Sequence, residues 1–422
     1  MRIAITTLGC KINQYESDLL KHDFASRGDS IVPFDAEADV YVINTCSVTA
    51  KSDVQSRQLI RAAVKRAPGA KVVVTGCYAE TQPDELRNIP GVGLVIGNRE
   101  KSTIPLRLAV NDETVRKDEA GTVMFKAVRT RTRAFLKIQD GCNNHCTYCI
   151  VPRARGKSRS IPILRVLDEV SRLGSDGCPE IVLTGIHLGS YGVDLKEPMT
   201  ITDAVRWVIE RSASSRIRLS SIEPLEITDQ LIGMLGKGLC RHLHIPLQSG
   251  DDAVLERMHR NYTKNYYMDL VQRIAESVPG VALGADVMVG FPGETDNEFE
   301  NTMKFIEQSP LTHLHVFTYS RRPGTIAAGM KNQVPEDIKK RRSEALRSVG
   351  RKNNQAFVRK MTGQKLDVVV EDKKHPESGL LMGVSDNYIR VQINGAKTAH
   401  IGGIIPVQID QVMEGENIAT KI

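Results

Sequence analysis

The sequence has no long hydrophobic run. Among its 422 residues, no apolar stretch approaches the roughly 20 residues needed to cross a bilayer. The opening stretch, Met1–Cys10, contains an apolar segment too short for a secretory signal peptide. We therefore expect a cytoplasmic protein with no membrane partner.

Cysteine is also scarce. Eight cysteines in so long a chain argue against a disulfide framework, which is typical of short secreted domains. Two of them, Cys178 and Cys240, stand apart from any other cysteine, and we expect them to be ordinary core or surface residues.

Three of the remaining cysteines, Cys142, Cys146 and Cys149, lie within eight residues. One loop of that length can wrap a single inorganic cluster, and cysteine is the usual ligand of iron–sulfur clusters. A four-iron cluster would find only three thiolates here, which leaves one iron open to a substrate or cofactor. We interpret the loop as an iron–sulfur site.

A zinc site is the main alternative for this loop. Zinc sites usually show a second Cys-x-x-Cys or Cys/His pair after a long spacer, and no such pair follows. His145 could supply a fourth ligand, but a ligand directly beside Cys146 would strain a tetrahedral loop.

Positive charge is concentrated around this loop and near the C-terminal end. The chain carries a formal charge of +7, and residues 331–360 alone hold ten Lys or Arg against three acidic residues. This pattern suits a polyanionic substrate such as RNA, although a solvated surface would explain it too. The basic residues flanking the loop are Lys126, Arg129, Arg131, Arg133 and Lys137 before it, and Arg153, Arg155, Lys157 and Arg159 after it.

The first hundred residues alternate short β-rich runs with helical patterns, which predicts a parallel α/β domain. The predicted strands are Arg2–Thr7, Val40–Asn44, Lys71–Thr75 and Leu94–Ile96, and the predicted helices are Asn13–Ser26, Ser52–Arg66 and Glu80–Asn88.

A cysteine follows each of the first three of these strands: Cys10, Cys46 and Cys77. In an open parallel sheet, groups just beyond the carboxyl ends of the strands converge on one crevice. A single cysteine in such a place would be read as a small buried hydrophobe. Three in equivalent positions predict a second cluster, again held by three thiolates.

From Ala134 onward the pattern is strand then helix, repeated six times, which predicts an open partial barrel. The predicted strands are Ala134–Gln139, Glu180–Thr184, Arg216–Ser220, His242–Ile245, Leu283–Val289 and His313–Thr318. In barrels of this kind the chemistry gathers at the C-terminal ends of the strands. Those ends carry Thr184-Gly185-Ile186, Glu223 and Gln248, among other polar and glycine residues.

The last part of the chain changes character. Pro335–Lys360 is predicted to be a long helix, with Pro335 in its first turn and its basic residues opposite an apolar face. The short β runs Lys365–Glu371, Leu380–Ser385, Tyr388–Ile393 and Pro406–Met413 then predict a small antiparallel β-barrel, a fold often used to bind RNA. Acidic and basic residues balance in this region, so RNA contact would need a local patch. The candidate RNA-binding residues are Lys365, Lys373, Lys374 and Arg390, together with Arg153.

The spacing Cys142-x-x-x-Cys146-x-x-Cys149, with Tyr148 before the last cysteine, resembles the radical S-adenosylmethionine (SAM) superfamily. That resemblance implies a four-iron four-sulfur cluster whose open iron binds SAM, and an electron donor of flavodoxin or ferredoxin type. One electron then cleaves SAM to give a 5′-deoxyadenosyl radical. It also suggests a set of SAM contacts: Tyr148, Arg155, Thr184, Gly185, Ile186, Glu223 and Gln248, with Arg153 as an alternative to Arg155.

The N-terminal motifs Thr7-Leu8-Gly9-Cys10-Lys11-Ile12-Asn13-Gln14-Tyr15-Glu16-Ser17, Asn44-Thr45-Cys46-Ser47-Val48-Thr49 and Thr75-Gly76-Cys77 resemble the methylthiotransferases. These radical SAM enzymes carry two four-iron four-sulfur clusters, insert sulfur into an unactivated C–H bond and methylate it. The residues from Lys11 to Ser17 resemble the branch that acts at carbon 2 of N6-threonylcarbamoyladenosine, next to the tRNA anticodon. The resemblance implies a tRNA anticodon stem-loop as partner, not DNA, and assigns no catalytic side chain beyond the clusters.

The resemblance covers the whole chain and divides it into an N-terminal α/β domain (1–115), a radical SAM partial barrel (126–357) and a TRAM-like β-barrel (358–422). The alternatives are methylthiolation of isopentenyladenosine or of a ribosomal-protein aspartate. A non-catalytic RNA-binding or electron-transfer protein that carries clusters is an alternative of another class, but fully ligated clusters would fit it better.

Overall fold

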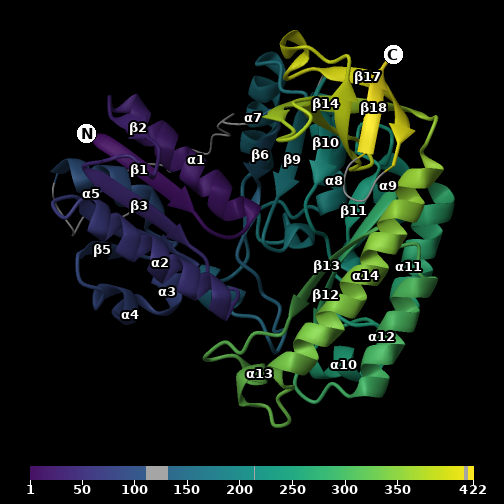
Figure 1. Ribbon diagram of the computed structural model, residues 1–422, viewed down its shortest axis with the longest axis horizontal. Coiled ribbons are helices and arrows are strands. Elements are labelled where there is room, and N and C mark those ends of the chain that lie inside the picture. The colour runs from purple at the N-terminus through teal and green to yellow at the C-terminus, as the bar shows by residue number, and fades with distance from the viewer. Residues whose placement is uncertain (111–131, 213, 413–416) are drawn as a thin grey trace. The chain divides into compact units, whose positions relative to one another are not determined.

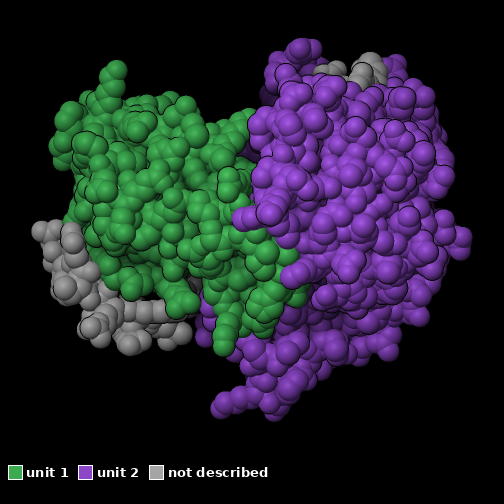
Figure 2. Space-filling view, turned by 90° about the horizontal axis from the view of Figure 1, so that it is seen from below, with its two compact units in different colours: residues 1–128, 140–158, 320–328 green, residues 129–139, 159–319, 329–422 purple. Residues whose placement is uncertain are grey.

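The computed structural model describes residues 1–110, 132–212, 214–412 and 417–422 (Figure 1). Contacts divide the chain into two compact units, coloured in Figure 2. Unit 1 comprises residues 1–128, 140–158 and 320–328, and unit 2 comprises residues 129–139, 159–319 and 329–422. Both sets of three cysteines predicted to bind clusters therefore belong to unit 1. The basic residues Lys126, Arg129 and Arg131, and the predicted boundaries at 115 and 126, lie outside the described residues.

Unit 1 is built on a five-stranded parallel sheet with the order β2-β1-β3-β4-β5. Its elements are β1 (Arg2–Thr7), α1 (Lys11–Ser26), β2 (Ser30–Val32), β3 (Val40–Thr45), α2 (Ala50–Arg66), β4 (Lys71–Gly76), α3 (Cys77–Thr81), α4 (Pro83–Arg87), β5 (Val92–Ile96), η1 (Lys101–Thr103), α5 (Ile104–Val110) and α6 (Val151–Arg155). β3 is buried along its whole length, as expected of a central parallel strand.

The sheet is covered on both faces. One apolar cluster joins the strands to Leu20 and Phe24 of α1 and to Ile104 of α5. A second cluster, on alternate strand residues, joins them to Ile60 of α2 and Tyr78 of α3. Since successive side chains of a strand point to opposite faces, these two clusters lie on the two sides of the sheet. The predicted parallel α/β arrangement is confirmed.

One predicted helix of this unit was wrong. The helix expected over Glu80–Asn88 is instead two short helices, α3 and α4, separated at Gln82. Pro83 follows Gln82 and disfavours helical backbone in the residue before it, and Gln82 has φ −142° and ψ 60°. β2, an edge strand of three residues, was not predicted from the sequence.

Unit 2 begins with six parallel strands. Two three-stranded sheets, β10-β9-β6 and β11-β12-β13, are joined by a parallel bridge between Ser221 and His244. These strands are β6 (Ala134–Lys137), β9 (Glu180–Thr184), β10 (Arg216–Leu219), β11 (His242–His244), β12 (Ala282–Val289) and β13 (His313–Thr318). The predicted open partial barrel is confirmed, with all six strands where the sequence placed them to within a residue or two.

Helices and short segments connect these strands. They are α7 (Ile163–Ser175), η2 (Leu188–Ser190), α8 (Ile201–Arg211), η3 (Pro224–Glu226), α9 (Asp229–Met234), α10 (Asp252–Arg257), α11 (Lys264–Ser277) and α12 (Asp296–Gln308), with the short strand β8 (Arg159–Ser160). The short strand β7 (Gln139–Asp140) has one residue in each unit, and the short helix α13 (Ile326–Gly329) follows β13 and belongs mainly to unit 1. α8 and α12 both start with capping boxes, at Thr200 and Thr295, which satisfy backbone N–H groups of the first turn. None of the helices in the described part of the chain combines the length and hydrophobicity that a bilayer crossing requires.

The long helix α14 (Glu336–Lys360) packs on β13 and α12 (Figure 1). Pro335 stands just before its first turn as the N-cap residue. The expectation that its basic residues all face away from the core was wrong for two of them. Lys339 and Arg342 are 4% and 6% exposed, because their charges meet Glu336, Glu294 and Asp296 within unit 2.

The chain ends in a closed five-stranded barrel with the order β14-β15-β16-β18-β17. Its elements are β14 (Lys365–Lys374), β15 (Leu381–Ser385), β16 (Arg390–Asn394), η4 (Thr398–His400), β17 (Ile404–Gln411) and β18 (Asn417–Lys421). The barrel was predicted, but β18 was missed, and its pairing with β16 is parallel where an all-antiparallel barrel was expected. Residue 413, the predicted end of the last strand, lies outside the described residues.

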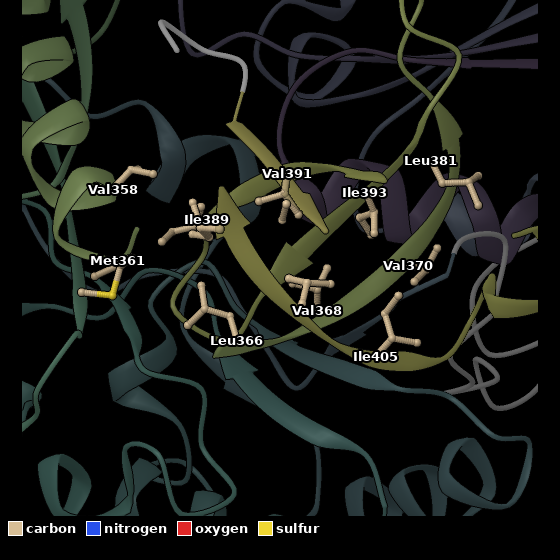
Figure 3. Close-up of a cluster of buried hydrophobic side chains, with 14 of the residues drawn as sticks. Val358, Met361, Leu366, Val368, Val370, Leu381, Ile389, Val391, Ile393 and Ile405 are labelled. Carbon is tan, nitrogen blue, oxygen red and sulfur yellow. The ribbon is translucent and has the colours of Figure 1, made fainter. Parts of the chain in front are cut away.

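The core of this barrel also anchors it to the end of α14. Val368, Val391 and Ile393 are fully buried among their neighbours, and Val358 and Met361 from the end of α14 join the same cluster (Figure 3). Ala282, the first residue of β12, belongs to it as well.

Candidate functional site

Three cysteines of unit 1 stand at the carboxyl ends of neighbouring strands. Cys10 follows β1 and precedes α1, Cys46 directly follows β3, and Cys77 directly follows β4. Since β1, β3 and β4 are adjacent in the sheet, their carboxyl ends share one edge. The structure thus places the three cysteines at one edge of the sheet, as the sequence predicted.

The three thiols lie close enough to influence one another. A Cβ atom on Gly9, beside Cys10, would lie 2.8 Å from Cβ and 2.9 Å from Sγ of Cys46. Gly9 has φ +98°, a conformation that favours glycine. The pKa of Cys46 is raised to about 11, mainly by burial, with smaller contributions from the charges of Cys77 and Cys10. A cation that neutralised these thiolates would remove this cost, so the donor set suits a metal centre.

The second set of cysteines lies on the loop after β7. Gly141, with φ +75°, opens this loop, and a Cβ there would lie 2.1 Å from the Lys157 carbonyl oxygen. Cys142 N–H donates to the Gly156 carbonyl at 3.1 Å, so the loop closes on itself. The backbone N–H of Asn144 donates to Cys142 Sγ at 3.4 Å. Hydrogen bonds from N–H groups to cysteine sulfur are typical of the loops that hold iron–sulfur clusters.

An asparagine connects the two cysteine sets within unit 1. Asn98 Nδ2 lies 3.6 Å from Cys77 Sγ and donates to the carbonyl of Ala154, just beyond the second cysteine loop, at 2.8 Å. The Glu80 carboxylate accepts a hydrogen bond from the backbone N–H of Asn98 at 2.7 Å. Sequence reasoning did not single out Asn98, because it follows the short strand β5 outside any cysteine motif.

A buried ion cluster also joins the two loops. Arg155 NH1 lies 2.9 Å from Glu16 and 3.0 Å from Asp140, and its NH2 lies 2.6 Å from Asn13 Oδ1. Lys101 Nζ reaches Glu16 at 2.5 Å. Burial alone would lower the pKa of Arg155, but Glu16 and Asp140 raise it well above its ordinary value.

These contacts give the family-like residues of α1 a structural role. Asn13 also donates to the carbonyls of Leu8 and Thr45, at 2.8 and 3.0 Å, which ties together the chain on either side of Cys10 and Cys46. Arg155 was predicted to contact SAM; within unit 1 its guanidinium binds two carboxylates, and the SAM contact stays a prediction.

The other predicted SAM contacts lie mainly in unit 2, at the carboxyl ends of its strands. Gly185 follows β9, and a Cβ there would lie 2.9 Å from Gln139 Oε1. Glu223 forms an ion pair with Arg260. Gln248 is a non-glycine residue with φ +69°, and its buried Oε1 has no hydrogen-bond partner among the described residues. An unpaired buried acceptor in a strained conformation is a frequent mark of a functional site.

Thr184 and Ile186 flank Gly185, and Thr184 accepts the backbone N–H of Ile138 at 3.0 Å through its carbonyl. Tyr148, in unit 1, is partly buried beside Cys149. His145, the alternative zinc ligand, is exposed. Cys178 and Cys240, expected to be core or surface residues, are both buried in unit 2.

Sequence reasoning missed a polar cluster on three neighbouring strands of unit 2. Asp286 of β12 lies 3.0 Å from His244 Nε2 on β11 and 3.3 Å from His315 Nδ1 on β13. A Cβ on Gly284 would lie 2.8 Å from His244, so the glycine makes room for the imidazole. Burial raises the pKa of Asp286, but the two histidines outweigh it and hold that pKa well below its usual range. The repeated His-Leu-His of residues 242–244 and 313–315 was the available signal.

The predicted RNA-binding residues are all exposed: Arg153 in unit 1, and Lys365, Lys373, Lys374 and Arg390 in unit 2. Lys365 begins β14, Lys373 and Lys374 end it, and Arg390 begins β16. Nothing in the described structure assigns them a ligand.

The chain matches two family models. Residues 136–306 match the radical SAM superfamily, and residues 2–97 match the uncharacterized protein family UPF0004. It is also similar over nearly its whole length to curated proteins. One is the threonylcarbamoyladenosine tRNA methylthiotransferase MtaB of Bacillus subtilis, 40% identical over 96% of this chain and 93% of that protein. The protein of the same name from Aquifex aeolicus is 38% identical over 97% and 100%.

More distant relatives share the fold. The tRNA-2-methylthio-N(6)-dimethylallyladenosine synthase of Fusobacterium nucleatum is 33% identical over 96% of this chain and 99% of that protein. Among solved structures, the radical SAM methyltransferase TsrM from Kitasatospora setae aligns with a TM-score of 0.56 at 16% identity, over 77% of this chain and 73% of that one.

Proposed function

The chain belongs to the radical SAM tRNA methylthiotransferases, and from this we propose that it methylthiolates carbon 2 of N6-threonylcarbamoyladenosine next to the tRNA anticodon. Family membership confirms the resemblance seen in the cysteine motifs. The chain is an enzyme that modifies tRNA, and its family uses SAM, a four-iron four-sulfur cluster and a second iron–sulfur cluster.

The observation that carries the proposal is that one compact unit presents two separate sets of three cysteines. Cys142, Cys146 and Cys149 would hold the cluster that binds SAM, and Cys10, Cys46 and Cys77 would hold the second cluster. Each set is one thiolate short of four, which leaves an open iron in each cluster. Two fully ligated electron carriers would need eight such ligands, and unit 1 contains six cysteines.

When bound, SAM and the two clusters supply what no protein side chain can: attack on an unactivated aromatic C–H bond, and the sulfur and methyl group to be added. The residues of this chain position the cysteines that would hold the two clusters. Asn13, Glu16 and Arg155 brace the two cysteine loops against each other within unit 1. Asn98 and the backbone N–H of Asn144 donate toward cysteine sulfur, which stabilises the thiolate form.

The remaining contacts are assigned as part of the proposal. SAM would be held by Tyr148, Arg155, Thr184, Gly185, Ile186, Glu223 and Gln248, and the tRNA by Arg153, Lys365, Lys373, Lys374 and Arg390. The partners would be the tRNA anticodon stem-loop and a flavodoxin- or ferredoxin-type electron donor, which places the enzyme with its substrate in the cytoplasm.

The choice of substrate rests on the N-terminal motif and on the relatives. Lys11, Asn13, Glu16 and the residues between them resemble the threonylcarbamoyladenosine branch, and relatives carrying that name are 40% and 38% identical. The relative named for dimethylallyladenosine is less similar, at 33%. The name of that relative is the observation that supports a second candidate substrate, the adenosine that carries an apolar isopentenyl group.

Nucleoside mass spectrometry tests the proposal. We expect tRNA from cells lacking this chain to carry threonylcarbamoyladenosine without its 2-methylthio group, and the intact gene to restore the group. The Cys46→Ala chain, as matched control, should not restore it. Loss of methylthio-isopentenyladenosine instead, with the threonylcarbamoyl nucleoside unchanged, would show that the second candidate is correct.

A further inference from the structure

Unit 1 contains a small polar cavity beside its cysteine loops. Its volume is about 130 Å³, and it is lined by Ser47, Thr81, Gln82, Ile150, Arg153 and Arg322, all from unit 1. We call it the Arg322 cavity.

The position of the cavity follows from the chain. Ser47 is the residue after Cys46, and Ile150 is the residue after Cys149. Thr81 lies one helical turn beyond Cys77 and donates to its carbonyl at 2.9 Å. The lining therefore comes from segments next to both cysteine sets, which are the proposed cluster ligands, so a group bound there would lie in their vicinity.

Arg322 is the unusual residue of this lining. It is 3% exposed, and its NH2 contacts the carboxylate of Asp53 and donates to Ser47 Oγ at 3.2 Å. Its Nε is buried and has no hydrogen-bond partner among the described residues. A buried donor left unpaired costs about 1–3 kcal/mol, so this N–H group points to an acceptor that the chain itself does not provide.

A second arginine lines the cavity from the solvent side. Arg153 is exposed, and its NH1 donates to the Pro323 carbonyl at 3.1 Å. Gly324, with φ +81°, makes room for it, because a Cβ there would lie 1.6 Å from Arg153 NH1. Asp53 offsets one of the two guanidinium charges. One positive charge remains beside the hydroxyl of Ser47, which suits a small anion with several acceptor oxygens.

We propose that the Arg322 cavity binds the carboxylate of the threonyl group carried by the substrate adenosine. The inference rests on the proposed function, because only the threonylcarbamoyl form of the nucleoside carries this carboxylate. A carboxylate accepts hydrogen bonds from an arginine fork and from hydroxyls at once. The apolar isopentenyl group would leave the Arg322 Nε unpaired, so the cavity also explains discrimination between the two nucleosides.

The test is RNA binding, which needs no turnover. Fluorescence anisotropy would compare three anticodon stem-loops: one with threonylcarbamoyladenosine, one with its carboxylate capped as a methyl amide, and one with plain adenosine. We expect the intact, cluster-loaded protein to bind the first at least about tenfold more tightly than the other two, the usual scale of a hydrogen bond to a charged group.

Two variants should remove this preference. The buried double variant should also leave binding of the plain stem-loop unchanged, whereas Arg153 is itself a candidate tRNA contact, so its variant is judged only by the ratio of the affinities for the three stem-loops. Arg153→Gln changes an exposed side chain, and the double variant Arg322→Gln/Asp53→Asn removes the buried pair together, so that no unpaired charge remains. Arg87→Gln, an exposed arginine of α4 in the same unit, is the matched control and should keep the preference. Thermal melting would verify that each variant is folded.

Other anions in the Arg322 cavity would give different binding results, and each of these results would overturn the proposal. If the cavity binds the SAM carboxylate, the variants will weaken SAM binding and leave the preference intact. If it binds a backbone phosphate, affinity for all three stem-loops will fall equally. If the intact protein forms methylthio product on threonylcarbamoyladenosine and both variants keep the preference, this inference fails while the proposed function stands. If the intact protein modifies another nucleoside and shows no preference, the proposed function fails as well.

Discussion

At the scale of single residues, the two sets of cysteines proposed to hold clusters differ in how the chain presents them. Cys142, Cys146 and Cys149 share one loop, whereas Cys10, Cys46 and Cys77 come from three strand ends. The two remaining cysteines offer an internal comparison, because Cys178 and Cys240 are buried in unit 2. Cys178 Sγ contacts the Glu180 carbonyl at 3.3 Å, an ordinary core environment.

Replacing one cysteine of each set should separate the two proposed clusters. We expect Cys46→Ala to bind about four fewer iron atoms per chain, to lose methylthio product and to retain SAM cleavage, since the other cluster keeps its ligands. Cys142→Ala should abolish SAM cleavage. Iron analysis and detection of 5′-deoxyadenosine measure both effects. Cys178→Ala should match the parent protein, and full methylthiolation by Cys46→Ala would contradict the assignment.

The buried histidine His313 of β13 should make the stability of the protein depend on pH. Its pKa is lowered to about 4, mainly by burial and also by the charges of His315, His244 and Arg390. The folded protein therefore keeps this ring neutral below pH 6.5, while the unfolded chain takes up a proton there. Stability is fully present above pH 6.5 and is lost progressively as the pH falls toward 4, by about 2 kcal/mol at pH 5.

Denaturant unfolding at pH 7.5 and pH 5 tests this. The variant His313→Asn should lose less stability on acidification than the parent protein, by up to about 2 kcal/mol. His259→Asn, at an exposed position where asparagine tolerates the positive φ of 54°, is the control and should behave like the parent. Equal acid sensitivity in all three proteins would rule out His313 as the source.

At the scale of elements, one buried carboxylate joins β9, β10 and the C-terminal barrel. Glu180 is fully buried and pairs with Arg133, Arg216 and Arg218 at 2.7–3.2 Å. Burial would raise the pKa of Glu180, but the three arginines hold it far below its usual range. Arg216 and Arg218 also donate to the carbonyls of residues 384–386, at the end of β15 and just beyond it. The ion cluster therefore fastens the β-barrel to the radical SAM sheet.

We expect Glu180→Gln to destabilise unit 2 by about 3–5 kcal/mol, because it leaves buried arginines without a counter-charge. Hydrogen exchange should also speed up in β14 and β15, whose carbonyls those arginines hold. Glu210→Gln, an exposed residue of α8, is the control. A loss below about 1 kcal/mol would mean that the arginines find other partners.

At the scale of the whole molecule, the question is how a chain with an overall charge of only +7 binds a polyanion. The basic excess is uneven, and part of it is unavailable to RNA. Lys339 and Arg342 of α14 are buried in ion pairs, and Arg155 is occupied by Glu16 and Asp140. The exposed candidates on the C-terminal barrel, Lys373 and Lys374 among them, are therefore more important than the basic count suggests.

Salt dependence measures their contribution. If both lysines contact phosphates, Lys373→Gln/Lys374→Gln should reduce the slope of log affinity for tRNA against log salt by roughly 1.5. The double variant Lys237→Gln/Lys304→Gln removes two exposed lysines elsewhere in unit 2 and should leave the slope unchanged. The same slope in both double variants would exclude the end of β14 from the RNA-binding surface.

The local information of the sequence determined most of the architecture. Short β-rich runs placed nearly all the strands of both units, and the cysteine spacing and strand-end positions predicted both cysteine sets and the family. Where local rules failed, the cause was also local: Pro83 splits a helix, and β2 and β18 are short strands at the limits of the pattern.

Only the tertiary structure decided which charged and polar groups meet. Arg322 and Asp53 are 269 residues apart in the chain, and Arg155 and Glu16 are 139 apart. His244, Asp286 and His315 come together because three strands lie side by side. Periodicity shows which face of an element is buried. The partner of a buried charge depends on the packing of distant segments. Burying a charge costs desolvation free energy, and this cost is offset only where the fold places an opposite charge beside it.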